Sequence, residues 1–156
     1  MFPPPVSGAY VLVLRLGRAL VLSVGRLGRF RFPAGVYVYL GQAGGAGGLR
    51  ARLGRHLRGP ARPRWHVDFL RLHAQVTAWG WRTDTHGPDG PWECVWSQAL
   101  LQRPEVFLPA PGFGASDCQK GCPAHLVGLH TEQVEWLPLY LGLEEWVVGM
   151  GEGADG

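Results

Sequence analysis

Residues Val36–Leu57 have the sequence VYVYLGQAGGAGGLRARLGRHL, and this stretch decides the fold of the chain. Its first five residues are β-branched, aromatic or apolar, a composition that favours a half-buried strand. Glycines at 44, 45, 47 and 48 then let the backbone turn sharply and approach a ligand closely. From Leu49 onward a leucine recurs at every fourth position, which predicts a helix with one apolar face. Because a helix start attracts negative charge, the stretch predicts an anion-binding turn between a strand and a helix.

The common nucleotide-binding loops do not fit this turn. A P-loop ends in Gly-Lys-Ser/Thr, and the stretch contains no lysine. No register of its glycines gives the GxGxxG pattern, and only Asp68 lies near the place of a ribose-binding acid. Mononucleotides and dinucleotides are therefore disfavoured as the anion.

The residues around this stretch predict an α/β (α+β) fold. Proline-rich and glycine-rich segments divide them into short elements. The predicted elements are strands at Gly8–Leu16, Ala19–Val24 and Arg29–Phe32, a helix at Trp65–His73, a strand at Ala74–Trp81, a loop at Asp84–Gly90, a helix at Pro91–Gln102, a glycine-rich loop at Pro109–Cys122, a strand at His125–His130 and a last strand or helix within Gln133–Val148. We expect a small antiparallel sheet with an inserted hairpin, flanked by helices. This single domain would span 8–148, between a flexible N-terminus at 1–7 and a disordered tail at 149–156.

Composition and charge indicate a folded protein with an anionic partner. Of 156 residues, 46% are hydrophobic and 17% are charged, which is enough apolar content for one core. Eleven arginines precede Asp68, the first acidic residue, whereas neither Lys nor Arg follows Lys120. The basic first half favours nucleic acid as a partner, and a solvated basic face is the alternative.

Cysteine content and hydropathy indicate a cytoplasmic location. Three cysteines without a signal-like leader argue against a secreted disulfide framework. No apolar run approaches the ~20 residues that a membrane span needs. We therefore expect no association with a membrane.

Two tyrosine motifs and one helical segment resemble those of the GIY-YIG nucleases. The tyrosine motifs are Gly8-Ala9-Tyr10 and Tyr39-Leu40-Gly41, and the helical segment is LRARL at Leu49–Leu53. Together with WHVDFL at 65–70 and FGASDC at 113–118, they resemble an uncharacterised branch of that superfamily, sometimes attached to endonuclease III-like glycosylases. The resemblance implies that the two tyrosine-bearing strands are neighbours in a small antiparallel sheet. It also implies metal-dependent hydrolysis of phosphodiester bonds in DNA, or alternatively in RNA.

The resemblance implies particular roles for four residues. Arg52 matches the catalytic arginine and supplies a permanent charge with fork geometry for phosphate. Glu93 matches the metal-binding glutamate, with Mg²⁺ or Mn²⁺ as the cation. Tyr10 or Tyr39 would accept a proton from the attacking water, provided that Arg52 or the metal lowers the phenol pKa.

Histidines and arginines near Arg52 complete the expected interface. His56 lies one turn after Arg52 and matches a position that the family fills with His or Tyr. His56 and His66 are candidate proton relays or phosphate contacts. The arginines expected to contact nucleic acid are Arg50, Arg55, Arg58, Arg62 and Arg64.

Each of these residues also has an ordinary structural interpretation. Tyrosines pack in strands, and an arginine on a helix is by default solvated. Glu93, in the first turn of a predicted helix, would also stabilise the helix N-terminus. His66 would also fit as a buried histidine hydrogen-bonded to Asp68 or to backbone.

Two departures from the family favour a weaker site. The chain contains no asparagine, which the family carries late in the domain, and Ser116 and Asp117 are the candidates for polar support there. Gln42 stands where the family usually has a lysine-like residue. A catalytically weakened nucleic-acid-binding module is therefore the alternative function.

Cys118, Cys122 and His125 follow the spacing Cys-x₃-Cys-x₂-His and offer three zinc ligands. The candidates for a fourth ligand are Cys94, Asp117 and His130. This spacing is not one of the strong zinc signatures, so we favour a structural role in a tight loop over zinc binding. A Cys118–Cys122 disulfide is the other alternative, and a cytoplasmic location disfavours it.

Overall fold

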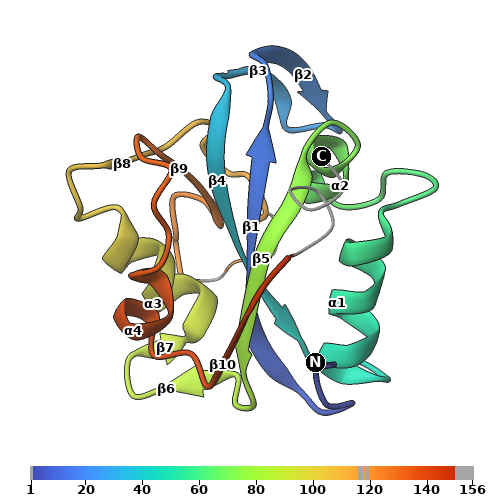
Figure 1. The fold of residues 1–156 in the computed structure, drawn as a ribbon, viewed down its shortest axis with the longest axis vertical. Coiled ribbons are helices and arrows are strands. Elements are labelled where there is room, and N and C mark those ends of the chain that lie inside the picture. The colour runs from blue at the N-terminus through green and yellow to red at the C-terminus, as the bar shows by residue number, and fades with distance from the viewer. Residues whose placement is uncertain (1, 116–117, 119, 150–156) are drawn as a thin grey trace.

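The computed structural model describes residues 2–115, 118 and 120–149, and Figure 1 shows their arrangement. The elements are β1 (Gly8–Leu16), β2 (Leu20–Val24), β3 (Gly28–Phe32), β4 (Gly35–Ala43), α1 (Gly48–Arg58), α2 (His66–Arg71), β5 (Gln75–Arg82), β6 (His86–Gly87), β7 (Gly90–Pro91), α3 (Trp92–Leu100), β8 (Val106–Phe107), β9 (Leu126–Leu129), α4 (Leu137–Leu141) and β10 (Glu145–Val148). Among the described helices, none is long and apolar enough to cross a membrane.

A six-stranded antiparallel sheet forms the centre of the molecule, with strand order β10-β5-β1-β4-β9-β8. β1 pairs with β4 along its full length, so the two tyrosine-bearing strands are neighbours. The β2–β3 hairpin is inserted between them in sequence and forms its own two-stranded sheet. The predicted α+β fold with an antiparallel sheet and an inserted hairpin is confirmed.

Helices cover both faces of this sheet, as Figure 1 shows, with α1 on one side and α3 and α4 on the other. Alternate residues of β1 point to opposite faces because successive side chains of a strand alternate. Val11 and its neighbours at odd positions pack with α3 and α4, whereas Leu12 packs with Leu49 and Leu53 of α1. A strand buried on both faces explains why β1 is almost continuously apolar.

Three parts of the chain differ from the sequence expectation. The predicted loop at Asp84–Gly90 contains the short β6 strand, which pairs with β7, and β8 is a two-residue strand that no pattern indicated. The segment Gln133–Val148 divides into a helix and a strand, α4 and β10. Such short pairings depend on tertiary contacts, because two or four residues carry too little periodicity to be recognised.

The N-terminal segment, expected to be flexible, lies across the start of α1. The backbone carbonyls of Val6 and Pro4 accept hydrogen bonds from the N–H groups of Leu49 and Arg50, at 2.8 and 3.2 Å. A Cβ on Gly48 would collide with the Val6 backbone. The expected anion-binding turn is therefore not available, because this segment satisfies the first N–H groups of the helix.

Candidate active site

The candidate site is a cleft of about 420 Å³ at the edge of β4. β9 pairs with β4 only from Val36 to Tyr39, so the rest of β4 has no strand on that side. The loop before β9 takes its place at one point, where Leu40 N–H donates to the His125 carbonyl at 2.9 Å. Because the sheet ends here, side chains from elements on both of its faces reach the same cleft. Those used below are Tyr39, Arg52, His86, Glu93, Cys94, Cys118, Lys120 and His125.

One side of the cleft, the sheet wall, consists of Tyr39 and Arg52 with Tyr10 directly behind them. The Tyr10 side chain is 1% exposed, and its hydroxyl oxygen is joined to His56 Nε2 by a 2.8 Å hydrogen bond. Tyr10 is paired with Gly41 across the strands, and a Cβ on Gly41 would lie 2.5 Å from the Tyr10 hydroxyl oxygen. The glycine of the second tyrosine motif is thus needed to make room for the tyrosine of the first.

Burial keeps Tyr10, Tyr39 and His56 neutral. It raises the pKa of Tyr10 well above the ordinary phenol value, and it raises the pKa of Tyr39 to about 12 although nearby Arg52 lowers it. Burial also lowers the pKa of His56 to about 3. At neutral pH both phenols of the free chain therefore hold their protons, which opposes the expected role of either tyrosine as a base.

Arg52 is held at the cleft by backbone and by an aromatic ring. Its guanidinium donates to the Gln42 carbonyl at 3.2 Å and lies 4.4 Å from the centre of the Trp65 ring. Arg55 contacts the same ring at 4.0 Å. Such cation–π contacts fix a guanidinium without neutralising its charge, so Arg52 remains able to attract a phosphate.

Asp68 connects α1 to α2 and fixes Arg55. The Asp68 side chain is fully buried, and both of its oxygens accept hydrogen bonds from Arg55, at 2.9 and 2.8 Å. The N–H groups of Arg64 and Trp65 also donate to it. Burial alone would raise the pKa of this carboxyl, but the hydrogen bonds outweigh burial and hold the pKa below its usual value. Asp68 is therefore a structural anion, and it forms a two-bond ion pair with the guanidinium of Arg55.

The opposite side of the cleft, the helix wall, begins with Glu93 at the start of α3. Within the described part of the chain, Glu93 Oε1 is buried and has no hydrogen-bond partner. Burial raises the pKa of this carboxyl above its usual value. The helix start is fixed by Trp92, whose indole N–H donates to Asp84 at 3.1 Å and whose ring lies 4.3 Å from the Arg82 guanidinium. A carboxylate oxygen that has no partner among the described residues, on a fixed helix, is a suitable ligand for a cation.

The remaining predicted site residues lie outside the cleft or at its margin. His66 Nδ1 accepts a hydrogen bond from Gly114 N–H at 2.8 Å, and His66 packs against Phe113 behind the cleft. Arg50 donates to the Pro3 carbonyl. Arg58, Arg62 and Arg64 are exposed. The predicted polar support, Ser116 and Asp117, lies outside the described residues.

One comparison with known proteins identifies a family. The family described as "Domain of unknown function DUF123" matches residues 9–138. The chain belongs to this family. No match was found among curated proteins or among solved structures. The family description names no activity, so the function of this DUF123 domain has to be argued from the cleft.

Among the polar residues that line the DUF123 cleft, His86 and Lys120 were not predicted as site residues, and Cys94 was considered only as a zinc ligand. Lys120 is the only lysine of the chain, in a sequence that otherwise uses arginine, and this was the available signal. It places a positive charge in the same cleft that Gln42 lines. His86 comes from the β6–β7 turn, whose contacts the sequence did not indicate.

Proposed function

We propose that this DUF123 domain is a metal-dependent endonuclease that hydrolyses phosphodiester bonds in DNA, or alternatively in RNA, in the cytoplasm. The observation that carries the proposal is the buried Oε1 of Glu93, which has no hydrogen-bond partner in the described part of the chain and belongs to a residue lining the same cleft as Arg52 and Tyr39. A carboxylate and a guanidinium that share a cleft without pairing leave room for a cation and a phosphate between them. The order of Tyr39, Arg52 and Glu93 along the chain agrees with the resemblance to the GIY-YIG nucleases.

Glu93 is the residue that would hold the metal. Its carboxylate oxygen is a hard ligand suited to Mg²⁺ or Mn²⁺, which commonly use one or two carboxylates with water and substrate phosphate. A bound cation would neutralise charge on the phosphoryl oxygens and favour ionisation of a bound water. The absence of a hydrogen-bond partner for Glu93 Oε1 among the described residues agrees with this role.

The sheet wall would bind and orient the phosphate. Arg52 contributes two parallel donors that match phosphate oxygens, and Lys120 adds a second positive charge from the facing loop. Tyr39 keeps its proton and donates a hydrogen bond into the cleft, because its pKa is raised to about 12 by burial. Tyr10 and His56 form a neutral pair that fixes the position of Tyr39 from behind.

The second candidate function is binding of nucleic acid without cleavage. It is favoured by the exposure of Arg58, Arg62 and Arg64, which lie on or just after α1 and take no part in the ion pairs of the described residues. Exposed arginines bind the phosphate backbone in a salt-dependent manner that needs no catalytic metal.

Nicking of a supercoiled plasmid, with and without Mg²⁺ or Mn²⁺, tests the proposal. We expect metal-dependent nicking that falls about 100-fold or more in both Glu93→Gln and Arg52→Ala, since loss of one group that stabilises the transition state typically has this effect. Glu135→Gln and Arg29→Ala are matched controls, because both residues are exposed and lie outside the cleft.

Two results would contradict the nuclease assignment. Nicking that persists unchanged in Glu93→Gln would exclude Glu93 as the metal ligand, since the amide has no charge to hold the cation. Salt-sensitive DNA binding by a chain that shows no nicking with either Mg²⁺ or Mn²⁺ would favour the binding module.

A further inference from the structure

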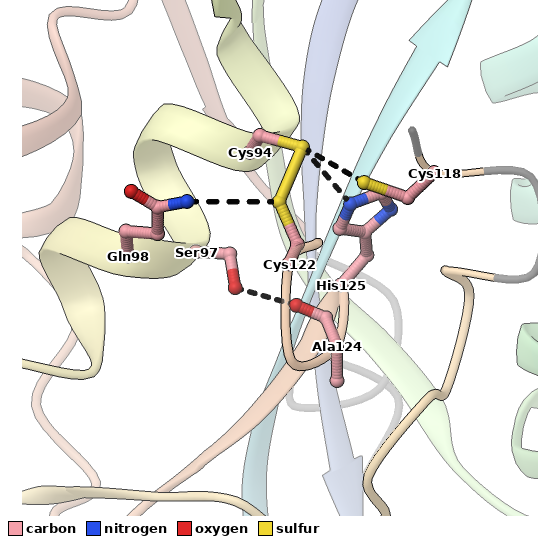
Figure 2. Close-up of a disulfide and its surroundings, with 7 residues drawn as sticks. All are labelled: Cys94, Ser97, Gln98, Cys118, Cys122, Ala124 and His125. Carbon is pink, nitrogen blue, oxygen red and sulfur yellow. Dashed lines mark hydrogen bonds between the residues drawn. A yellow bond between two sulfur atoms is a disulfide. The ribbon is translucent and has the colours of Figure 1, made fainter. Parts of the chain in front are cut away.

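We propose that Cys94, Cys118, Cys122 and His125 form a tetrahedral zinc site that joins α3 to the loop before β9. Cys94 lies in the first turn of α3, and the other three residues come from a segment that follows it by more than twenty positions. Figure 2 shows the four side chains converging from these two parts of the chain. The site does not depend on the proposed nuclease function.

The four ligand atoms of this cluster lie close to the separations that a metal site requires. Its four ligand atoms all lie within 4.8 Å of one another. Cys94 Sγ is 3.2 Å from Cys118 Sγ and 3.6 Å from His125 Nε2. Zinc bound tetrahedrally at about 2.3 Å from sulfur and about 2.0 Å from nitrogen requires ligand separations of roughly 3.5–3.8 Å. Small side-chain rotations would therefore bring all four atoms onto one ion.

The surroundings of the cluster also suit a metal. The His125 ring has a hydrogen bond with the Gly114 backbone, and Nε2 is the nitrogen that faces Cys94. Metal-binding histidines commonly use their second nitrogen in this way, because the bond fixes the ring and its tautomer. Gln98 Nε2 lies 3.9 Å from Cys122 Sγ, where an amide donor would stabilise a thiolate. Cys94, Cys122 and His125 are buried, so the ion would be shielded from water.

A disulfide explains only half of this cluster. The structure joins Cys94 to Cys122 by a disulfide, which leaves Cys118 as a free cysteine beside the same sulfur. A zinc site uses all three sulfurs and the imidazole. In the reduced chain, Zn²⁺ would bind three thiolates and one neutral imidazole and would release three protons to solvent. Starting from the disulfide, a thiol reductant must first supply two electrons and two protons.

Four protein ligands would make this a structural site. Such a site has no open position for water or substrate, unlike a catalytic zinc site with three protein ligands. Because Glu93 precedes Cys94 directly, and Cys94, Cys118 and His125 line the cleft themselves, zinc would fix the helix wall of the cleft. The zinc and the cation proposed at Glu93 are thus separate ions, with sulfur and oxygen ligands respectively.

Metal analysis of the full chain, purified and kept under a thiol reductant, tests the proposal. We expect one zinc per chain, and replacement by Co²⁺ should give the visible bands of a tetrahedral ion with thiolate charge-transfer absorption. Cys118→Ser should weaken metal affinity by more than about 100-fold, since changes to outer partners already cost about 10–100-fold. His73→Gln, at an exposed histidine away from the cluster, should bind metal like the parent chain.

Cys118→Ser distinguishes zinc from the disulfide, because Cys118 is not part of the disulfide and its replacement is not expected to unfold the chain. A reduced parent chain that binds no zinc or Co²⁺ would overturn the proposal. So would a Cys118→Ser variant with unchanged metal affinity. Neither readout involves nucleic acid, so failure of the nuclease assignment would leave this result unaffected.

Discussion

The two walls of the cleft are held in place by different kinds of contact. In the sheet wall, backbone pairing between β1 and β4 positions Tyr10 and Tyr39, and Asp68 ties α1 to α2. In the helix wall, Glu93 depends on how α3 is anchored, through Trp92 and through the cluster around Cys94. Regular hydrogen bonding makes the first wall rigid by itself. The second wall depends on a few side-chain contacts, which a metal or a redox change can alter.

The largest expected change in the free energy of unfolding comes from breaking the Asp68 contacts that support the sheet wall. Asp68→Asn should lower the free energy of unfolding by about 3 kcal/mol, the lower end for a broken buried pair, because Arg55 is 22% exposed and water can partly solvate it. The pKa of Asp68 in the folded state lies below its ordinary value. The stabilisation is therefore present above the unfolded-state pKa and is lost as pH falls through the folded-state pKa. Urea unfolding at several pH values measures both effects.

Asp84→Asn is the matched control for this prediction. Asp84 makes the same two-bond contact with Arg82, but its side chain is 47% exposed. An exposed pair contributes about 1 kcal/mol or less. Equal losses in the two variants would show that burial of Asp68 does not matter, and would contradict the structural role given to it.

A smaller loss of folding free energy is expected when the packing between the two tyrosine motifs is disturbed. In Gly41→Ala the new Cβ would displace the Tyr10 ring and break its hydrogen bond with His56, at a cost of about 1–3 kcal/mol. Urea unfolding and the Tyr10 near-ultraviolet signal would report the change. Gly44→Ala is the control, because nothing lies within 4 Å of its Cβ. If the two variants were equally stable, the close packing of Tyr10 on Gly41 would be refuted.

These contrasts explain which parts could be predicted from the sequence. The strands β1 and β4 follow from apolar runs, and α1 follows from leucine spacing, because these are patterns that the sequence displays. The pairing of β1 with β4 was expected only from the resemblance to the GIY-YIG nucleases. No sequence pattern indicates the contact between Cys94 and His125, since it depends on the path of the chain between them. The position of the N-terminal segment on α1 could not be predicted either, because its contacts are made by backbone carbonyls, which every residue carries.

The smallest expected change in the free energy of unfolding concerns Glu93 in the helix wall, and here the substitution stabilises the chain. Burial raises the pKa of Glu93 in the folded chain, so the folded state binds this proton more tightly than the unfolded state. The ionised carboxylate therefore destabilises the metal-free chain, and this penalty develops as pH rises from the unfolded-state pKa through the folded-state pKa. Glu93→Gln should be more stable than the parent at neutral pH by at most about 1 kcal/mol, because solvent screens a half-buried group.

Thermal unfolding with and without Mg²⁺ separates this penalty from an ordinary change in packing. Without metal, the advantage of Glu93→Gln should vanish as pH falls below the unfolded-state pKa, where the parent carboxyl is protonated in both states. Added Mg²⁺ should raise the unfolding temperature of the parent but not that of Glu93→Gln, since a cation that binds only the folded state stabilises it. Glu135→Gln, at an exposed site, should follow the parent in both experiments. If Mg²⁺ stabilised Glu93→Gln as much as the parent, Glu93 would not be a metal ligand and the two walls would not share a cation.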